Sequence, residues 1–366
     1  MRSTSRQLAW LAFILAVVVT AAACGSSDDG DAADNPAVTS PTASAAVDYS
    51  SLTGTLNGGG SSFQDTLQQA VIAAFADVAG GLTVNYAKSS SGDGIAKLAS
   101  DSIQFAGTDR PVKDGELSGG FLYFPVAAAP ITVSFNLPGI SELKLSGPTV
   151  AGLFAGSITS WDDPAITADN GTAVAATPVT VCRRSKDSGT TNNFTTYLDA
   201  VAPDVWTLDV GGTVSNWPAN SQGGETNSDV ANCVKATAGA VGYVDVADAI
   251  KAGVSYAQVR NEAGNYVTAD LAGTQAALAS ATVEDNLIFD PLNAGGAEAY
   301  PITSPTWVVV KTDQPDGARA TALRGYLGYL LTDGQDLTAG AGYAGLPSEL
   351  RSRAVAQLDR LAPPTT

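Results

Sequence analysis

The sequence predicts an α/β fold that is divided into two domains. Strand-like and helix-like segments alternate from residue 52 to residue 331, which is the pattern of α/β units with mainly parallel sheets. The body from residue 51 to residue 366 is long enough for two domains, and 45% of the chain is hydrophobic, so two sizeable cores can form. We find no internal repeat.

The spacing of apolar residues assigns the individual elements. Strands are short runs of β-branched and aromatic residues, whereas an amphipathic helix places its apolar residues on one face, as Leu67, Val71 and Phe75 do. The predicted strands are residues 52–56, 82–86, 103–106, 124–136, 179–183, 240–244 and 306–311. The predicted helices are residues 65–78, 95–99, 150–154, 194–200 and 318–331.

The N-terminal segment predicts export and lipidation. Arg2 and Arg6 precede an apolar stretch over residues 8–19, which is shorter than the ~20 residues that a membrane-spanning helix needs. Three alanines then lead into Cys24, an arrangement that resembles a bacterial lipobox. It implies a lipoprotein signal peptide over residues 1–23 and a lipid on Cys24, and the alternative is an ordinary signal peptide with an incidental cysteine.

Residues 24–50 predict a disordered tether behind that cysteine. The segment is rich in Ser, Ala, Asp, Thr and Pro and has no aliphatic periodicity. Such a composition cannot bury enough apolar surface to fold. No second long apolar run follows the signal segment.

The composition excludes several functions. The net charge of −17 and the lack of a basic stripe argue against nucleic acid as a partner. The chain has no histidine, which excludes Ser-His triads and His-ligated zinc hydrolases, and we predict no cofactor, metal or catalytic residue. Cys182 and Cys233 remain after Cys24, and in an oxidising space they predict a disulfide, with two free buried thiols as the alternative.

Three Ser-, Thr- and Gly-rich segments each lie between a predicted strand and a predicted helix, at residues 58–63, 89–94 and 187–191. The N-terminus of a helix has free N–H groups and a positive dipole end, and glycine lets a ligand approach the backbone. A single segment of this kind is most simply a helix cap. Three of them, with Arg184 just ahead of the third, predict convergence on one tetrahedral oxyanion.

The order and spacing of these motifs resemble the phosphate-binding proteins of bacterial phosphate importers, a branch of the type II periplasmic binding proteins. The segments that carry the resemblance are residues 58–63, 86–95, 105–109, 136–139, 153–166, 183–191, 239–244 and 300–302. The resemblance implies ligand-binding roles for Ser62, Phe63, Ser91, Asp109, Arg184, Ser188, Gly189 and Thr190.

Asp109 is the expected source of specificity. Phosphate near neutral pH carries a proton and sulfate does not, so a carboxylate accepts a hydrogen bond from phosphate and repels sulfate.

Three features depart from the family pattern. Arg110 is expected to pair with Asp109 or to touch the ligand, Asp93 lies inside the second segment and adds an acid near the anion, and Ser62 stands where Thr is common. Trp161 and Tyr243 are interpreted as packing residues.

The resemblance also implies a fold and a biological role. The fold has two α/β lobes joined by two hinge crossings, with lobe 1 at residues 51–128 and 300–366, lobe 2 at residues 129–299, and the ligand in the cleft. The protein is expected to be a monomer, lipid-anchored to the outer face of a bacterial cell membrane. There it would bind inorganic phosphate and deliver it to the permease and ATPase subunits of an ABC importer.

Two other functions stay open from the sequence. One is a binder of another oxyanion, such as molybdate or sulfate, against which Asp109 argues. The other is an extracellular phosphoester hydrolase, against which the missing histidine argues.

Overall fold

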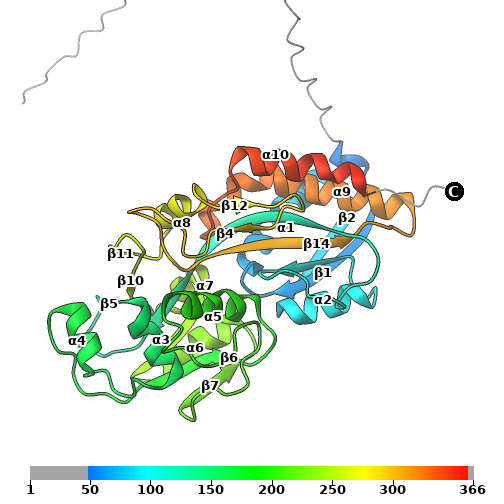
Figure 1. Cartoon of the computed structure of the whole chain (residues 1–366). Coiled ribbons are helices and arrows are strands. Elements are labelled where there is room, and N and C mark those ends of the chain that lie inside the picture. The colour runs from blue at the N-terminus through cyan, green and yellow to red at the C-terminus, as the bar shows by residue number, and fades with distance from the viewer. Residues whose placement is uncertain (1–47, 362–366) are drawn as a thin grey trace, which may run out of the picture. The chain divides into compact units, whose positions relative to one another are not determined.

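The structure is a computed structural model that describes residues 48–361 (Figure 1). The predicted signal peptide, Cys24 and the tether up to residue 47 lie outside these residues. Among the described residues, no helix combines the length and the apolar character needed to cross a membrane.

One large sheet runs through the described chain. Its strands follow the order β2-β1-β3-β14-β4-β8-β6-β7, and the short strand β9 (Ser255–Tyr256) pairs with β4 beside this path. The other bounds are β1 (Gly54–Ser61), β2 (Leu82–Ser89), β3 (Phe105–Thr108), β4 (Phe121–Phe135), β6 (Thr180–Arg184), β7 (Ser221–Gly224), β8 (Ala240–Asp245) and β14 (Thr303–Lys311).

Strand β4 divides the sheet into two halves. Its residues 121–130 pair with β14, and its residues 131–135 pair with β8. The chain returns at the same place, because the Ile131 N–H donates to the Ile302 carbonyl oxygen at 2.8 Å just before β14 begins. We call the half with β1, β2, β3 and β14 the first lobe and the half with β6, β7 and β8 the second lobe. The lobe boundaries at residues 128/129 and 299/300 stay a prediction.

Helices cover the strands of both lobes. In the first lobe, Figure 1 shows α9 and α10 above the strands and α2 below them. Helix α1 has the predicted bounds and buries Leu67, Val71 and Phe75, as its apolar spacing requires. The helices are α1 (Asp65–Val78), α2 (Ser91–Ala99), α3 (Gly147–Ala155), α4 (Pro164–Asn170), α5 (Gly189–Val201), α6 (Asn227–Ala236), α7 (Val246–Ala252), α8 (Leu271–Leu278), α9 (Gly317–Leu331) and α10 (Ser348–Ala356).

Short elements fill the connections. They are the strands β5 (Lys144–Leu145), β10 (Gln258–Arg260), β11 (Tyr266–Val267), β12 (Thr282–Val283) and β13 (Phe289–Asp290), and the 3₁₀ turns η1 (Tyr49–Ser51), η2 (Asp333–Leu337), η3 (Ala339–Ala341) and η4 (Gln357–Arg360).

Two predictions about the sheet were wrong. The sheet is mixed, because the long strands β4 and β14 run antiparallel to their neighbours while the shorter strands pair in parallel. Residues 58–61, which were predicted to lie after the first strand, are instead the end of β1. Glycine is needed there for packing. A Cβ atom on Gly58 would lie 2.1 Å from the Phe105 ring, and one on Gly60 would lie 2.4 Å from the Gly107 carbonyl oxygen.

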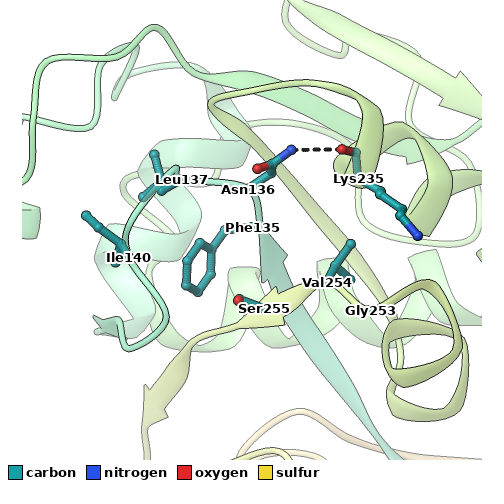
Figure 2. A pocket seen from close by; sticks show the side chains of 8 residues that line it. All are labelled: Phe135, Asn136, Leu137, Ile140, Lys235, Gly253, Val254 and Ser255. Carbon is teal, nitrogen blue, oxygen red and sulfur yellow. Dashed lines mark hydrogen bonds between the residues drawn. The ribbon is translucent and has the colours of Figure 1, made fainter.

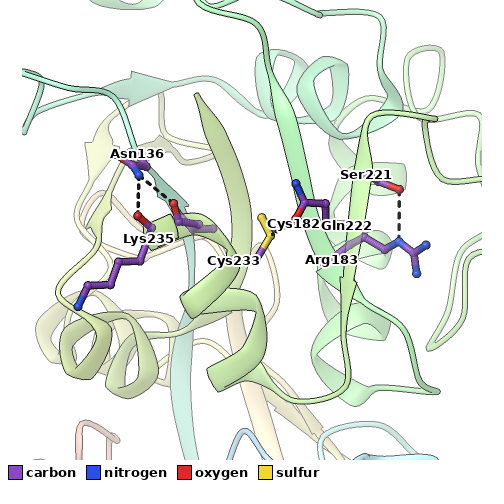
Figure 3. The surroundings of a disulfide bond; sticks show 8 residues. Asn136, Cys182, Arg183, Ser221, Gln222, Cys233 and Lys235 are labelled. Carbon is purple, nitrogen blue, oxygen red and sulfur yellow. Dashed lines mark hydrogen bonds between the residues drawn. A yellow bond between two sulfur atoms is a disulfide. The ribbon is translucent and has the colours of Figure 1, made fainter. Parts of the chain in front are cut away.

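The predicted disulfide between Cys182 and Cys233 is confirmed (Figure 3). Cys182 lies on β6 and Cys233 on α6, with 6.0 Å between their Cα atoms. The bond therefore fastens α6 to the sheet of the second lobe, next to buried Val230 and Val234. Trp161 packs as expected, fully buried, and its indole N–H donates to the Gly239 carbonyl oxygen at 2.9 Å.

Candidate functional site

The structure brings the eight predicted ligand-binding residues together where the two lobes meet. Ser62 and Phe63 follow β1, Ser91 begins α2, and Asp109 follows β3. From the second lobe, Arg184 ends β6, and Ser188, Gly189 and Thr190 form the start of α5. These residues are all buried, and even the long side chain of Arg184 is only 3% exposed.

Helices α2 and α5 begin earlier than the apolar spacing predicted. Helix α2 starts at Ser91 and α5 at Gly189, because polar side chains cap both helices. The Ser90 hydroxyl accepts from the Asp93 N–H, and the Ser188 hydroxyl accepts from the Thr191 N–H. The Ser- and Gly-rich motifs therefore form first helical turns, and their positive dipole ends meet between the lobes.

Hydrogen bonds join the two lobes at this place. The Gly189 N–H donates to the Ser91 hydroxyl at 3.0 Å, and an Arg184 Nη2–H donates to the Ser89 carbonyl oxygen at 3.2 Å. The backbone N–H of Asn227, on α6, donates to the Ser62 hydroxyl at 3.0 Å. The described structure is therefore a closed arrangement of the two lobes around these residues.

Asp109 is a buried carboxylate held by hydroxyl groups. Thr306 donates to its Oδ1 at 2.7 Å, and Ser61 donates to its Oδ2 at 2.5 Å. Burial raises the pKa of Asp109 to about 6, although the hydrogen bonds from Ser61 and Thr306 and the charge of Arg184 act in the opposite direction. At neutral pH this group is mostly an ionised hydrogen-bond acceptor.

Arg184 supplies a buried positive charge. Its guanidinium donates to two backbone carbonyl oxygens, those of Glu225 and Ser89, and to the side-chain oxygen of Asn227. Burial lowers the pKa of Arg184, and the electrostatic influence of the Tyr243 hydroxyl and of the Asp109 carboxylate opposes this shift, but an arginine stays protonated in proteins. None of the ion pairs formed among residues 48–361 includes Arg184. Its charge is therefore available to an anion.

One of the two expectations for Arg110, its pairing with Asp109, was wrong. Arg110 does not pair with Asp109. Its guanidinium, 1% exposed, binds two other carboxylates, Glu116 of the first lobe and Asp187 of the second, each through two nitrogen atoms. The two shortest distances, both from Nη2, are 2.7 Å. The carboxylates of Glu116 and Asp187 attract the guanidinium away from Asp109, whose oxygens already accept from hydroxyl groups.

The structure adds detail to the expectations for Phe63 and Tyr243. The Phe63 backbone N–H, expected to face the ligand, donates to the Ser61 hydroxyl at 3.0 Å. Tyr243 is buried as expected, but its hydroxyl accepts from the Arg184 backbone N–H at 3.0 Å and lies 2.8 Å from the Thr191 hydroxyl. Tyr243 therefore supports the third motif as well as the core.

Sequence reasoning missed several polar residues that hold the site. Ser61 lies one position before the predicted Ser62, so a shift by one residue in the Gly58–Ser62 run would have found it. Asn193 is on α5 with the third motif, and its side chain donates to the Asp109 carbonyl oxygen at 2.6 Å. Thr306 and Asn227 lie 197 and 165 residues from their partners Asp109 and Ser62, and no local pattern marks them.

The residues described here offer hydroxyl and N–H donors, one guanidinium and one carboxylate. Among residues 48–361 there is no group of three or more Cys, Asp or Glu side chains placed to hold a metal ion. The arrangement suits binding of a small oxyanion that carries a proton.

Known proteins that are similar to this chain bind a small oxyanion of this kind. A family model described as a PBP superfamily domain matches residues 36–334. The phosphate-binding protein PstS of Xylella fastidiosa strain 9a5c is 32% identical over 347 residues, which cover 92% of this chain and 93% of the relative. Phosphate-binding protein PstS 3 of Mycobacterium leprae is 30% identical over 314 residues, which cover 82% of this chain and 85% of the relative.

Solved structures share the fold. A high-affinity periplasmic phosphate-binding protein, PfluDING, bound with phosphate, matches with a TM-score of 0.69 at 22% identity, covering 83% of this chain and 94% of that one. The phosphate-binding protein from Stenotrophomonas maltophilia matches with a TM-score of 0.68 at 20% identity, again covering 83% and 94%. At these identities the likeness concerns the two-lobed α/β fold.

Proposed function

This chain belongs to the PstS family of phosphate-binding proteins within the PBP superfamily, and on that premise we propose that it captures inorganic phosphate outside the cell and delivers it to an ABC importer. The observation that carries the proposal is the buried guanidinium of Arg184, which has no carboxylate partner among the described residues and lies among hydroxyl and N–H donors from both lobes.

The proposed ligand contacts follow from donor chemistry. Arg184 offsets the charge of the anion, and Ser62, Ser91 and Thr190 donate from hydroxyl groups, while Gly189 donates from its backbone. Charge-assisted hydrogen bonds contribute roughly 1.5–3 kcal/mol each, so a few of them supply the about 8 kcal/mol of a micromolar complex. Phe63 and Ser188 complete the proposed set.

Asp109 provides the proposed selection of phosphate over sulfate. Its carboxylate accepts a hydrogen bond from the P–O–H group of monohydrogen or dihydrogen phosphate, and a fully deprotonated anion leaves that acceptor facing a negative charge. For this role one of the two oxygens of Asp109 accepts a hydrogen bond from the anion in addition to the one from its present partner, Ser61 or Thr306.

Binding is proposed to favour the closed lobes. Ser62, Ser91 and Asp109 belong to the first lobe, and Arg184 and the start of α5 belong to the second, so only the closed form makes every contact. The family is one of substrate-binding proteins, and we propose that no bond is made or broken. The closed lobes, with boundaries near residues 128/129 and 299/300, would dock on the permease of the importer.

Membrane attachment is a separate part of the proposal. The lipobox-like run before Cys24 supports cleavage of a signal peptide and lipidation at the outer face of the cell membrane. Cys24→Ala is expected to release the protein from membranes into the medium. Fractionation of cells that produce the variant and the wild type would measure this, and equal membrane retention would contradict a lipid anchor.

Calorimetry tests the proposed ligand. The phosphate-stripped protein is titrated with phosphate, arsenate, sulfate and molybdate at two pH values. Tight binding of phosphate and arsenate and weak binding of sulfate and molybdate are expected. Preferred binding of sulfate or molybdate would replace the proposal by another oxyanion. Turnover of a phosphoester in a phosphatase assay with added divalent metals would indicate a hydrolase.

A further inference from the structure

Asn227 is a buried residue whose polar atoms face the proposed phosphate site from α6. It is the first residue of that helix and has no exposed surface. Its backbone N–H donates to the Ser62 hydroxyl at 3.0 Å, and its side-chain oxygen accepts from an Arg184 Nη1–H at 2.8 Å. Its side-chain nitrogen donates to the Thr190 hydroxyl at 3.2 Å and to the Asp245 carboxyl at 2.8 Å. Three of the four partners are proposed ligand residues.

From these contacts we propose that Asn227 is a positioning residue of the anion site, which turns the hydroxyl groups of Ser62 and Thr190 into donors for the anion and holds the guanidinium of Arg184 without neutralising it. The inference rests on the proposed phosphate function and deepens it.

The direction of the hydroxyl groups is the first step. A hydroxyl both donates and accepts, whereas an anion accepts only. Each of the two hydroxyl oxygens receives an N–H from Asn227, so its own hydrogen points elsewhere. Among residues 48–361, no hydrogen bond uses the hydroxyl of Ser62 or Thr190 as the donor. Both hydrogens are therefore left for a ligand.

The orientation of the amide is the second step. Asp245 is buried, with 1% exposed, and its Oδ2 accepts from the side-chain nitrogen of Asn227. A flipped amide would place its oxygen against that carboxyl oxygen and its NH₂ group against the guanidinium. The hydrogen bonds to Asp245 and from Arg184 would then both be lost. Asp245 thus fixes the amide so that its oxygen faces Arg184.

The neutrality of the amide is the third step. The Asn227 oxygen and the backbone carbonyl oxygens of Glu225 and Ser89 orient the guanidinium of Arg184. A carboxylate in the same place would orient it equally well but would cancel the charge that the anion needs. Three uncharged acceptors fix the group and keep its charge available.

Two variants separate positioning from a merely structural role. Asn227→Ala removes the side-chain contacts and is expected to weaken phosphate binding roughly tenfold to a hundredfold, because a charge-assisted bond and one donor direction are lost. The double variant Asn227→Asp with Asp245→Asn keeps the net charge and reverses the hydrogen bond between positions 227 and 245. It is expected to recover the melting temperature of the wild type and yet bind phosphate weakly, since a carboxylate now pairs with Arg184.

Asn136→Ala is the matched control. Asn136 holds the other end of α6, where its side chain donates to the carbonyl oxygens of Val234 and Lys235 at 3.0 and 2.9 Å. Figures 2 and 3 draw the bond to Lys235. It lines a separate pocket with Phe135 and Lys235. This variant is expected to lower the melting temperature and leave the phosphate affinity unchanged.

Calorimetry with inorganic phosphate and thermal unfolding are measured for all four proteins. Wild-type affinity in Asn227→Ala, or recovery of affinity together with stability in the double variant, would overturn the role of Asn227. If Asn227→Ala does not fold, the double variant alone decides. A wild-type protein that fails to bind phosphate would overturn the proposed function, which is a different result.

Discussion

Asp109 shows how a single carboxylate responds to its surroundings. The side chain is buried next to Arg184, yet the nearest groups are the hydroxyls of Thr306 and Ser61, which donate to its two oxygens. An oxygen of an ionised carboxylate can accept more than one hydrogen bond, so room for a donor from the ligand remains. This room would let Asp109 accept a hydrogen bond from a protonated anion, as the proposed selection of phosphate requires.

Replacement of this acceptor is expected to change selectivity. In Asp109→Asn, an NH₂ group replaces one acceptor oxygen, so sulfate meets a donor and phosphate loses the partner of its proton. We expect phosphate affinity to fall roughly 10- to 100-fold and sulfate affinity to rise. Calorimetry with both anions measures this, with Asp93→Asn as the control, because the Asp93 side chain is 42% exposed and pairs with Lys97. Unchanged selectivity in Asp109→Asn would refute the role of Asp109.

The raised pKa of Asp109 predicts how the stability of the phosphate-free protein depends on pH. Because burial raises the pKa from 3.8 to about 6, the folded state binds the proton more tightly than the unfolded state. This contribution to stability is fully present below pH ~4 and is lost as the pH rises through ~6, up to about 3 kcal/mol in total.

Asp109→Asn should remove this pH dependence. The free energy of unfolding of the variant relative to the wild type is expected to grow between pH 4 and pH 7 and to level off above that range. Denaturant titrations of phosphate-free protein at several pH values measure it. A difference that stays constant across this range would show that Asp109 titrates in the folded protein as it does in the unfolded chain.

At the residue scale, the sequence predicted site residues that stand within motifs. It did not predict those that come to the site from elements distant in the sequence. Ser91, Asp109 and Arg184 stand in recognisable runs. Thr306 comes from β14, and Asn227 follows a capping residue, Thr226, that is ordinary for any helix. The partner of Arg110 was missed for the same reason, because Asp187 lies 77 residues further along the chain. Pairing across such distances depends on the tertiary structure.

At the scale of elements, apolar periodicity predicted what burial controls. Helix α1 is long and buries one face, and the strand β4 is long and buried along nearly its whole length. Their sequences therefore carry clear patterns of apolar residues. The Gly58–Ser61 segment was not predicted as part of a strand, because glycine usually interrupts strands. Here the missing side chains leave space for the Phe105 ring and for the neighbouring backbone. The starts of α2 and α5 carry no apolar residue, so periodicity placed them one turn late or more.

The start of α5 gives a prediction about closure. A Cβ atom on Gly189 would lie 2.6 Å from the Ser91 hydroxyl and 2.7 Å from the Asp109 Cβ atom, both in the first lobe. Gly189→Ala is therefore expected to keep the lobes apart and to weaken phosphate binding at least tenfold, with little loss of stability. In the control Gly317→Ala, the added methyl group meets no atom within 4 Å. Equal affinities in the two variants, measured by calorimetry, would contradict a tight closure at Gly189.

At the scale of the whole molecule, the two-lobed α/β fold predicted from the family resemblance is confirmed by the family match and the solved structures. Composition and alternation alone predicted two domains but not their connection. The strand β4 passes from β14 to β8 without a break, and the return segment lies beside it at Ile302. Such a crossing needs strands that are distant in sequence to pair, so it cannot be read from a local pattern.

The ion pair between Arg110 and Asp187 is the contact expected to control how readily the molecule closes. Arg110 binds Glu116 within the first lobe and Asp187 across the lobes, and both carboxylates are partly exposed, at 25% and 29%. The cross-lobe pair adds to closure from the first residue of the third motif, and neither of its two side chains is among the eight proposed ligand residues. Because the carboxylates are partly solvated, its contribution is modest, on the order of 1 kcal/mol.

Asp187→Asn and Glu116→Gln form a matched pair of variants for this contact, since each removes one carboxylate from the same guanidinium. We expect Asp187→Asn to weaken phosphate binding by up to roughly tenfold and to enlarge the radius of gyration of the phosphate-free protein in X-ray scattering, and Glu116→Gln to do neither. Loss of a negative charge near an anion site would by itself strengthen binding, so weaker binding identifies the lost cross-lobe bond. If both variants changed affinity equally, or if Asp187→Asn bound phosphate more tightly, closure would not depend on this pair.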